Sequence, residues 1–269
     1  MIELRPYQKK IVHDGTQIIS RYGFLYLAME VRTGKTLTSL SICTKINAIN
    51  VLFITKKKAI SSIEEDMDKL KGPFKLHVIN YESLHKVTHE GIYDVIVLDE
   101  AHCLGAFPKE NKRCKQVQRL INIHNSRVIL LSGTPTPESY SQMYHQVCGI
   151  SSNPFSFCKN FYQFAQNYVN VKYRIINGFR INDWSDGSPA ILEKMKPYTI
   201  SYTQKEAGFK VQTNEEILYV DICPEVTQMI KTLTKDKILK GTGDVVLADT
   251  PVKLMIKTHQ MSSGTVKFE

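Results

Sequence analysis

The tripeptide Gly34-Lys35-Thr36 is the first group in the sequence whose residue types and spacing could do chemistry. It follows an apolar run, Phe24–Met29, and opens a stretch with helical spacing. In such a loop, backbone N–H groups meet phosphates, Lys35 adds a positive charge, and the Thr36 hydroxyl can ligate Mg²⁺. Met29 stands where the strict G-x-x-x-x-G-K-[ST] pattern has glycine. The segment predicts a triphosphate-binding site. The alternative interpretation is that G-K-T occurs by chance at the start of a helix.

Two neighbouring acids, Asp99 and Glu100, end another apolar run, Asp94–Leu98. Open α/β sheets bind ligands at this end of their strands, so Asp99 would hold Mg²⁺ and Glu100 would orient and deprotonate the attacking water. Taken singly, D-E-A-H also fits a strand followed by a polar turn, and Ser132-Gly133-Thr134-Pro135 is merely turn chemistry. The three elements in this order, each at a strand's end, predict a P-loop nucleotide hydrolase that uses Mg²⁺.

The elements that must position these residues alternate between short apolar runs and helical patterns. The runs are nearly continuous, as in strands buried on both faces, and cover 24–29, 51–55, 76–80, 94–98 and 127–131. A helix is predicted from Tyr7 to Tyr22 with Gly23 as its cap, and Ser62 with Glu65 predicts a capping box. We therefore expect an α/β fold, a parallel sheet with helices on both faces.

After about residue 150 this alternation is lost. Aromatic residues at helical spacing predict a helix, and a hairpin is predicted on a type I′ turn at Asn177-Gly178. Further elements are a helix between Pro189 and Pro197, a half-exposed strand over 216–222 and a helix over 226–239. The helical aromatic stripe is Phe157, Phe161, Phe164 and Tyr168. Such a stripe predicts a core face rather than a platform for stacking bases.

Composition limits the class of protein. The chain has 269 residues and a formal net charge of +9, which permits a polyanionic partner. Its six cysteines have no C-x-x-C spacing, so reduced thiols are expected rather than a zinc site or disulfides. The sequence shows neither a membrane-spanning run nor a secretory signal, and a cytoplasmic protein (bacterial, or in the host if encoded by a phage) is expected.

The order of these motifs resembles superfamily 2 helicases, and their wording is similar to the SWI/SNF-type, helicase-like DNA translocases, particularly compact bacterial or phage members. Leu4 to Gln8 resembles the family's opening L-x-x-Y-Q, and Leu27 to Thr36 its first motif. Ile79 to Leu84 is similar to its T-Y-E-x-L, and the remaining matches are Ile54-Thr55-Lys56, the DEAH box Asp99 to His102 and the S-G-T-P of Ser132 to Pro135.

This resemblance implies a RecA-like lobe and assigns roles to individual residues. Nucleotide binding falls to Gln8, which would read adenine, and to Arg32, Thr33, Gly34, Lys35 and Thr36. Lys35 and Glu100 would be catalytic, and Thr36 and Asp99 would hold Mg²⁺. His102, Ser132 and Thr134 would couple the nucleotide state to DNA, expected to be duplex, and the DNA contacts would come from Thr55, Lys56, Asn80 and Tyr81.

The resemblance continues more weakly through residues 175–200 and 259–264, and it implies three parts. These are a RecA-like ATP-binding lobe over 1–150, a mostly helical insertion with a hairpin over 151–210, and a segment over 211–269 leading toward a second lobe. The family's Q-x-x-G-R-x-x-R, whose arginines assist phosphoryl transfer, does not occur in this sequence. We therefore expect a second RecA-like lobe in cis or in trans, and weak hydrolysis without it.

Two alternatives stay open at this point. The same lobe occurs in strand-separating helicases and restriction-type translocases, and a DNA-binding module could keep the fold without turnover. The basic run Lys56-Lys57-Lys58 fits either a phosphate contact or a solvated loop. A second basic cluster is spaced for the solvent face of a helix and could also face DNA: Lys109, Lys112, Arg113, Lys115 and Arg119.

Overall fold

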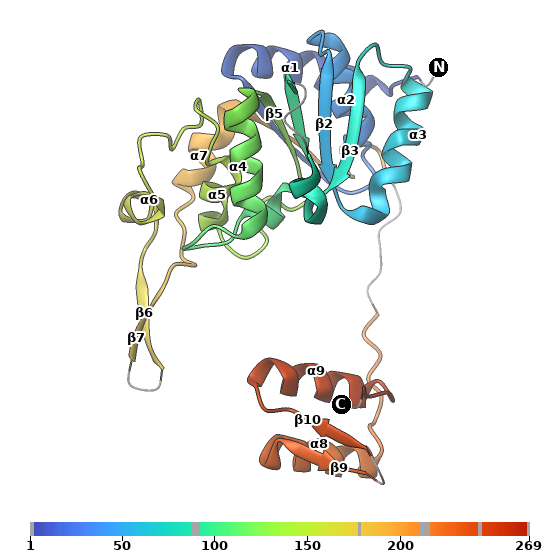
Figure 1. The fold of residues 1–269 in the computed structure, drawn as a ribbon, viewed down its shortest axis with the longest axis vertical. Helices are drawn as coiled ribbons and strands as arrows, with labels where there is room; N and C mark the ends of the chain where they lie inside the picture. Colours follow the sequence, from blue (N-terminus) through green and yellow to red (C-terminus); the bar gives the residue numbers. More distant parts are fainter. Residues whose placement is uncertain (1–2, 88–91, 177–178, 210–215, 242–243, 268–269) are drawn as a thin grey trace. The chain divides into compact units, whose positions relative to one another are not determined.

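In the computed structural model of the chain, the described residues are 3–87, 92–176, 179–209, 216–241 and 244–267 (Figure 1). They form two compact units, Met1–Val211 and Gln212–Glu269. The candidate site belongs to the first unit, and each unit is described by itself.

The first unit is built on a six-stranded sheet in the order β3-β2-β4-β5-β1-β8, with every neighbouring pair parallel. The expected α/β fold is confirmed, and the predicted runs match strands to within one residue. The strands are β1 (Phe24–Met29), β2 (Asn50–Thr55), β3 (Lys75–Asn80), β4 (Val95–Leu98), β5 (Arg127–Leu131) and β8 (Thr199–Tyr202). β8 joins the sheet beside β1 and was not predicted.

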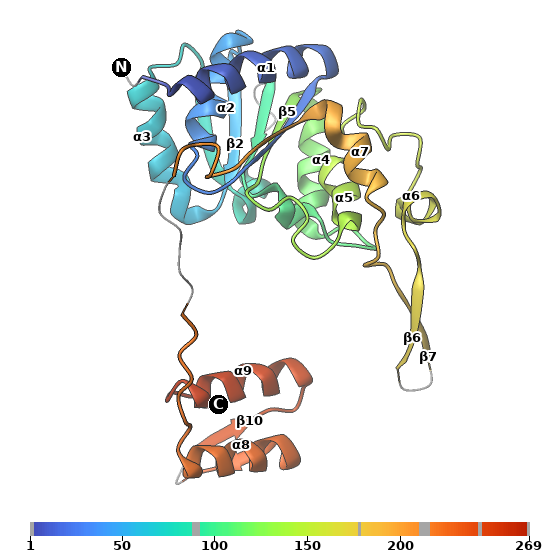
Figure 2. The same ribbon diagram turned by 180° about the vertical axis from the view of Figure 1, so that it is seen from behind.

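Helices cover both faces of this sheet because successive strand residues point to opposite sides. On one face, Leu25 and Phe53 pack with α1 (Pro6–Tyr22), α2 (Lys35–Lys45) and α3 (Ile60–Leu70). On the other, Tyr26 and Ile54 pack with α4 (Lys112–His124) and α5 (Met143–Val147). Figures 1 and 2 show these two helical layers from opposite sides.

Helix boundaries in the first half follow the sequence with one exception. α1 ends as predicted, since Gly23 adopts a left-handed φ of 74° and its N–H donates to the Ile19 carbonyl. The predicted capping box of Ser62 and Glu65 is wrong. α3 begins at Ile60, directly after a 3-10 turn, and the Ser62 hydroxyl donates to the Ala59 carbonyl from inside the helix.

The second half of the first unit contains α6 (Phe161–Tyr168), the hairpin β6 (Lys172–Ile176) and β7 (Phe179–Asp183), and α7 (Ala190–Met195). The helix between the two prolines is confirmed. Phe161 and Phe164 are buried as expected, whereas Phe157 lies before the helix and is exposed. The hairpin strands are confirmed, and the predicted turn at 177–178 lies outside the described residues.

The second unit contains α8 (Pro224–Asp236), the antiparallel pair β9 (Ile238–Lys240) and β10 (Val245–Leu247), and α9 (Pro251–Ser262). Its small core includes Leu233, Val246 and Met261. The strand predicted over 216–222 is wrong, because this segment has no strand pairing and its apolar side chains are exposed. The predicted helix ends earlier than expected, where Lys237 turns left-handed.

Across the described ranges of both units, none of the helices has the length and apolar character needed to cross a membrane.

Candidate active site at the carboxyl edge of the sheet

Four neighbouring strands bring the predicted chemical groups to one edge of the sheet. β1 leads into the loop 30–34, β2 ends at Thr55, β4 is followed by Asp99 and Glu100, and β5 is followed by Ser132. Because β2, β4, β5 and β1 are adjacent and parallel, their carboxyl ends lie along the same edge (Figure 1). Residues up to about a hundred positions apart in the sequence therefore meet at this edge.

The loop between β1 and α2 has the backbone expected of a phosphate cradle. Arg32 and Gly34 adopt left-handed φ values of 65° and 80°. α2 begins at Lys35 without a side-chain cap, so the N–H groups of its first turn face the loop. The Thr33 hydroxyl donates to the Glu30 carbonyl at 2.6 Å and closes the loop from inside. Met29 does not disturb this arrangement, because it is the fully buried last residue of β1.

Lys35 lies at the centre of the edge. Its ammonium donates to the carbonyls of Met29 at 2.9 Å and Glu30 at 3.3 Å. A Cβ atom built on Gly133 would lie 3.8 Å from its Nζ, so Lys35 also borders the loop that follows β5. Partial burial lowers the pKa of Lys35, and the carboxylates of Asp99 and Glu100 oppose that shift. The lysine thus faces both acids.

Asp99 is held by the ends of β2 and β3. Its Oδ2 accepts a hydrogen bond from the Thr55 hydroxyl at 2.7 Å, its Oδ1 accepts from the Glu100 N–H at 3.0 Å, and its carbonyl accepts from the Tyr81 hydroxyl at 2.7 Å. Burial raises the pKa of Asp99, and the bond from Thr55 partly offsets this. The carboxylate is therefore fixed in orientation.

These bonds give Thr55 and Tyr81 a role that was not expected from the sequence. Both side chains are buried, with exposed fractions of 0% and 2%. Each hydroxyl is directed at Asp99, so the two residues act as supports of Asp99. Their expected contact with DNA stays a prediction. Lys56 is exposed and Asn80 is half-buried, and both remain candidates for a DNA contact.

Glu100 adopts a left-handed φ of 50°, an uncommon conformation for a residue with a side chain. Its Oε1 lies 3.6 Å from the Lys56 ammonium and its Oε2 lies 3.5 Å from Nδ1 of His102. The same His102 nitrogen lies 3.0 Å from the Ser132 hydroxyl, which accepts a hydrogen bond from the Thr134 N–H at 3.2 Å. A continuous polar chain thus runs from Glu100 to the loop after β5.

Gln8 lies against the phosphate loop but has protein partners at both ends of its amide. Its Oε1 accepts from the Arg5 N–H at 2.9 Å, and its Nε2 donates weakly to the Gly34 carbonyl at 3.4 Å. The side chain is buried. Its expected contact with adenine stays a prediction, although its position beside Gly34 is suitable for one.

The last residue of β8 and a residue after it support the phosphate loop, a role that was not predicted from the sequence. Tyr202 stacks on Tyr7 with ring centroids 4.7 Å apart, and the Tyr7 hydroxyl donates to the Thr33 carbonyl at 3.1 Å. The Gln204 N–H donates to the Glu30 carboxylate at 2.7 Å. The sequence of 196–202 is the one feature that could have indicated this support. It was assigned to the insertion, and its strand is too short to be recognised from the sequence.

A second unpredicted support holds the loop after β5. The Tyr26 hydroxyl donates to Oε1 of Gln146 at 2.6 Å, and Nε2 of Gln146 donates to the Pro135 carbonyl at 2.8 Å. Both side chains are buried. The sequence gives no signal for this link, because the two residues are 120 positions apart.

The donor set fits a magnesium nucleotide. Mg²⁺ prefers oxygen ligands and usually takes one or two from the protein, with the rest from water and substrate phosphates. Asp99 and the Thr36 hydroxyl at the start of α2 are oxygen donors on this edge. A side chain at Gly34 would fill the cradle, since an added Cβ would lie 2.3 Å from Nε2 of Gln8. In the part of the chain that the structure describes, no three His, Cys, Asp or Glu residues form a metal cluster.

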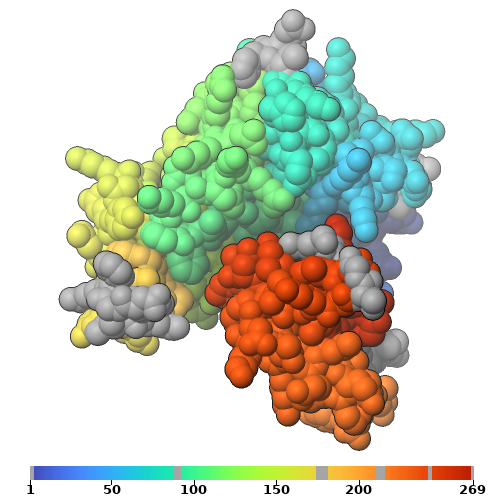
Figure 3. Space-filling model, turned by 60° about the horizontal axis from the view of Figure 1, so that its bottom comes forward, coloured from blue at the N-terminus to red at the C-terminus, as the bar shows by residue number. Residues whose placement is uncertain are grey.

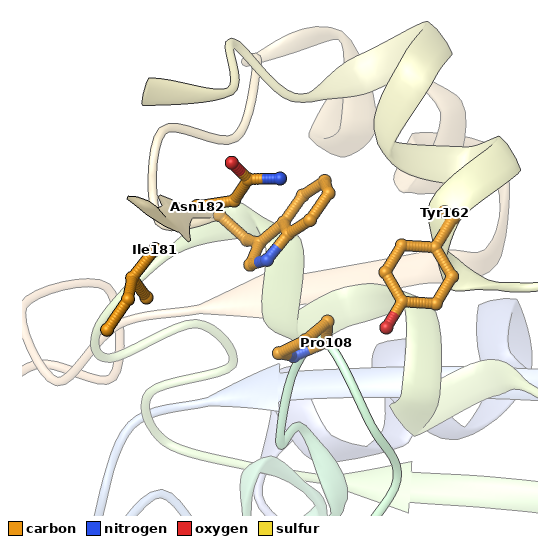
Figure 4. A pocket seen from close by; sticks show the side chains of 5 residues that line it. Pro108, Tyr162, Ile181 and Asn182 are labelled. Carbon is orange, nitrogen blue, oxygen red and sulfur yellow. The ribbon is translucent and has the colours of Figure 1, made fainter. Parts of the chain in front are cut away.

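Several hollows lie on the first unit, and two of them can be compared with the site. One of about 430 Å³ borders the site, with Glu30, Gly133 and Tyr202 in its lining. The other, of about 740 Å³, lies at the base of the hairpin (Figure 4), and its lining contains no charged side chain: Pro108, Tyr162, Ile181, Asn182 and Trp184. The second hollow therefore lacks the groups that a triphosphate requires.

A basic surface lies next to the edge. Lys56, Lys57 and Lys58 are exposed after β2, and the predicted basic cluster includes exposed residues of α4. Arg113 of α4 pairs with Glu82, which follows β3, at 2.6 Å. In Figure 3 the surfaces of the segments in the 80s (turquoise) and the 110s (green) are neighbours on this face. Exposed positive charge therefore lies beside the edge.

Comparisons with known proteins agree with this geometry. A family model described as the SNF2-related domain matches residues 42–261. The chain is 24% identical over 192 residues to SWI/SNF-related matrix-associated actin-dependent regulator of chromatin subfamily A-like protein 1 of Xenopus tropicalis, covering 63% of this chain and 19% of that protein. The Xenopus laevis protein of the same name matches to the same extent. The chain thus spans about a fifth of the length of these relatives.

Among solved structures, the fold is similar to the Sulfolobus solfataricus SWI2/SNF2 ATPase core in complex with dsDNA. The TM-score is 0.57 at 17% identity, and the match covers 97% of this chain and 58% of that one. At this identity the likeness shows the fold alone.

Proposed function

Because the chain belongs to the SNF2-related family, as its motif order predicted, we propose that the first unit is the nucleotide-binding lobe of a DNA-dependent ATPase that hydrolyses ATP to move on duplex DNA. One observation carries the proposal. Lys35, Asp99, Glu100 and Ser132 follow three adjacent strands, β1, β4 and β5, and meet at one edge of a parallel sheet.

The first step in the proposed mechanism is the binding of ATP. Gln8 reads the adenine, and the loop from Arg32 to Thr36 surrounds the phosphates with backbone N–H groups. Lys35 exchanges its two carbonyl partners for phosphate oxygens and balances their charge. Thr36 and Asp99 would hold Mg²⁺, and the ion would supply charge neutralisation at the terminal phosphates.

Glu100 performs the chemical step in this proposal. Its carboxylate orients the attacking water and accepts its proton. Asp99, held by Thr55 and Tyr81, keeps its orientation during the reaction. The transition-state arginine would come from a second RecA-like lobe, in cis or in trans, and without it we expect hydrolysis to be slower by about 10³–10⁵.

Coupling to DNA follows from the polar chain that begins at Glu100. His102 contacts both Glu100 and Ser132, and Ser132 holds the Thr134 N–H. A change at the terminal phosphate thus has a route to the loop after β5. Lys56 and Asn80, at the ends of β2 and β3, would contact the DNA backbone.

For the organisation of the chain, we retain the lobe over 1–150 and the insertion over 151–210 as a proposal, with one addition. The end of the insertion returns to the sheet as β8 and supports the phosphate loop through Tyr202 and Gln204. The segment 211–269 would lead toward the second lobe.

The test is the affinity for Mg-ATP, measured by calorimetry on the chain and on Lys35→Ala. Removal of a charged donor should weaken binding by about 10- to 150-fold. Lys45→Ala, which removes an exposed lysine from the other end of α2, is the matched control and should leave affinity unchanged. Wild-type affinity in Lys35→Ala would refute the site. In a protein that includes the second lobe, Glu100→Gln should keep ATP binding and lose DNA-stimulated turnover.

A further inference from the structure

Glu100 is paired with a residue that the proposed function assigns to DNA. Oε1 of Glu100 lies 3.6 Å from the ammonium of Lys56, which reaches across from the end of β2. The Lys56 side chain is 63% exposed and that of Glu100 is 33% exposed. One cation at the surface therefore has the general base on one side and solvent on the other.

The neighbouring lysines do not share this contact. Lys57 and Lys58 form the following 3-10 turn and are exposed. Within the described ranges, neither has a carboxylate at ion-pair distance, whereas Lys56 does. The run of three lysines thus contains one member whose charge is directed at the active site.

Pairing with an ammonium makes the Glu100 carboxylate less available to the attacking water. The Lys56 ammonium lies 3.6 Å from Oε1, so this oxygen faces a cation instead of the water that it would orient. Release of Lys56 would therefore free Oε1 for the attacking water.

We propose that Lys56 is a positioning residue with two alternative anionic partners, Glu100 when DNA is absent and a DNA backbone phosphate when it is bound. Binding of DNA withdraws the ammonium from Glu100 and leaves the carboxylate available to the attacking water. The inference rests on the proposed function and adds to it a reason for stimulation by DNA.

The strength of the pair suits such an exchange. An ion pair with one well-exposed partner is worth no more than about fivefold in an equilibrium constant. A phosphate, which gains further from release of condensed counterions, can compete against a pair of this strength. A fully buried pair would instead resist the exchange.

The test needs no turnover. If Glu100 and DNA compete for Lys56, removing the Glu100 charge should tighten DNA binding, and only when Lys56 is present. The affinity for a labelled duplex is measured by fluorescence anisotropy at one fixed salt concentration, with and without Glu100→Gln, in three backgrounds: wild type, Lys56→Ala and Lys57→Ala. Lys57→Ala is the matched control for Lys56→Ala, because it removes the same charge from the next position in the sequence but leaves the pair between Lys56 and Glu100 in place.

We expect Glu100→Gln to tighten DNA binding by about two- to fivefold in the wild-type and Lys57→Ala backgrounds. In Lys56→Ala this gain should fall to the small general effect of losing one negative charge. The melting of each variant, followed by Trp184 fluorescence in the first unit, checks that the fold is intact.

If Glu100→Gln tightened DNA binding equally in all three backgrounds, the inference would be overturned. The proposed function would still stand, because the protein would bind DNA without competition between Glu100 and DNA for Lys56. Absence of DNA binding in every background would instead refute both. A second readout is turnover in a protein with the second lobe, where Lys56→Ala should raise the DNA-free rate and reduce the ratio of stimulated to basal rate. An unchanged ratio would also contradict the inference.

Discussion

Tyr26→Phe isolates the buried link between β1 and the loop after β5. The substitution removes one oxygen atom and keeps the ring in the core. Tyr26 is 0% exposed, and burial raises the pKa of its phenol, so it remains a donor at any working pH. Its partner, Oε1 of Gln146 at 2.6 Å, is also buried. The variant therefore leaves a carbonyl oxygen in the core without its donor.

The expected cost is the desolvation penalty of that oxygen, about 1–3 kcal/mol in the free energy of unfolding. The lost hydrogen bond alone would account for only about 1 kcal/mol, since the unfolded chain regains it from water. A consequence for the site is also expected, because Gln146 holds the Pro135 carbonyl at 2.8 Å. Loosening this residue should weaken the response of ATP turnover to DNA more than it weakens ATP affinity.

Urea unfolding followed by tryptophan fluorescence is the suitable assay. The chain has a single tryptophan, Trp184, which lies in the first unit and packs on Phe161 with ring centroids 5.8 Å apart. Its signal thus reports the unit that contains the substitution. The midpoint should fall while the slope stays constant.

Two controls identify the cause. Tyr198→Phe removes a hydroxyl from a partly exposed ring that stays stacked on Phe24, and it should change stability by less than about 0.5 kcal/mol. In a Gln146→Leu background, Tyr26→Phe should cost far less, because the acceptor is gone. A change below about 0.5 kcal/mol for Tyr26→Phe in the wild-type chain would refute the reasoning.

Two further predictions concern the phosphate loop and its acid. Gly34→Ala and Gly208→Ala both place a side chain at left-handed φ, 80° and 79°, at a cost of about 1–2 kcal/mol each. Only Gly34→Ala should also weaken ATP binding in calorimetry, because its Cβ displaces Gln8 while Gly208 faces open space; equal ATP affinities would contradict this. Burial raises the pKa of Asp99 in the folded protein above its ordinary 3.8. The folded state therefore binds this proton more tightly than the unfolded state, and the free energy of unfolding falls as the pH rises from 3.8 to the raised pKa. Asp99→Asn should therefore raise the free energy of unfolding at neutral pH by about 0.5–2 kcal/mol in urea titrations while weakening Mg-ATP binding, and a loss of stability would show that its hydrogen bonds outweigh burial.

The sequence predicted the strands of the site well because each is a short apolar run that ends in a polar group. β1 and β5 coincide with the predicted ranges. The carboxyl ends of parallel strands lie along one edge of a sheet, so Lys35, Asp99 and Ser132 could be placed together from the sequence alone. Both parts depend on local pattern and on a single rule of sheet geometry.

The supports of the site could not be predicted in this way. Thr55 and Tyr81 were expected to contact DNA because they lie in segments that resemble the family's DNA-contacting motifs, whereas in the structure their hydroxyls donate to Asp99. A strand end gives no information about which side of the edge a hydroxyl faces. The link from Tyr26 to Gln146 depends on packing between β1 and α5, and local pattern does not encode such a contact.

β8 was missed for a different reason. Thr199–Tyr202 has only four residues and follows a helix and a 3-10 turn in a part of the chain where alternation is lost. Its place is fixed by pairing with β1, from Tyr26 opposite Thr199 to Met29 opposite Tyr202. A long-range register of this kind is invisible to a local window, so Tyr202 and Gln204 were not recognised as part of the site.

Among the described residues, six residues other than glycine have a left-handed backbone conformation, and two of them lie at the site. Arg32 and Glu100 both adopt left-handed backbone conformations that favour glycine, and each costs about 1–2 kcal/mol relative to an unstrained residue. Glycine would remove that cost at either position, but it would also remove a charged side chain from the edge of the sheet. Strain that persists where a simpler residue would relieve it is typical of functional positions.

At Glu100 the conformation directs the carboxylate toward Lys56 and His102. At Arg32 it keeps an exposed guanidinium in the loop that would surround the phosphates. Both strained residues thus carry a charged side chain at the edge of the sheet where the proposed hydrolysis takes place, and such charges act where charge changes during a reaction.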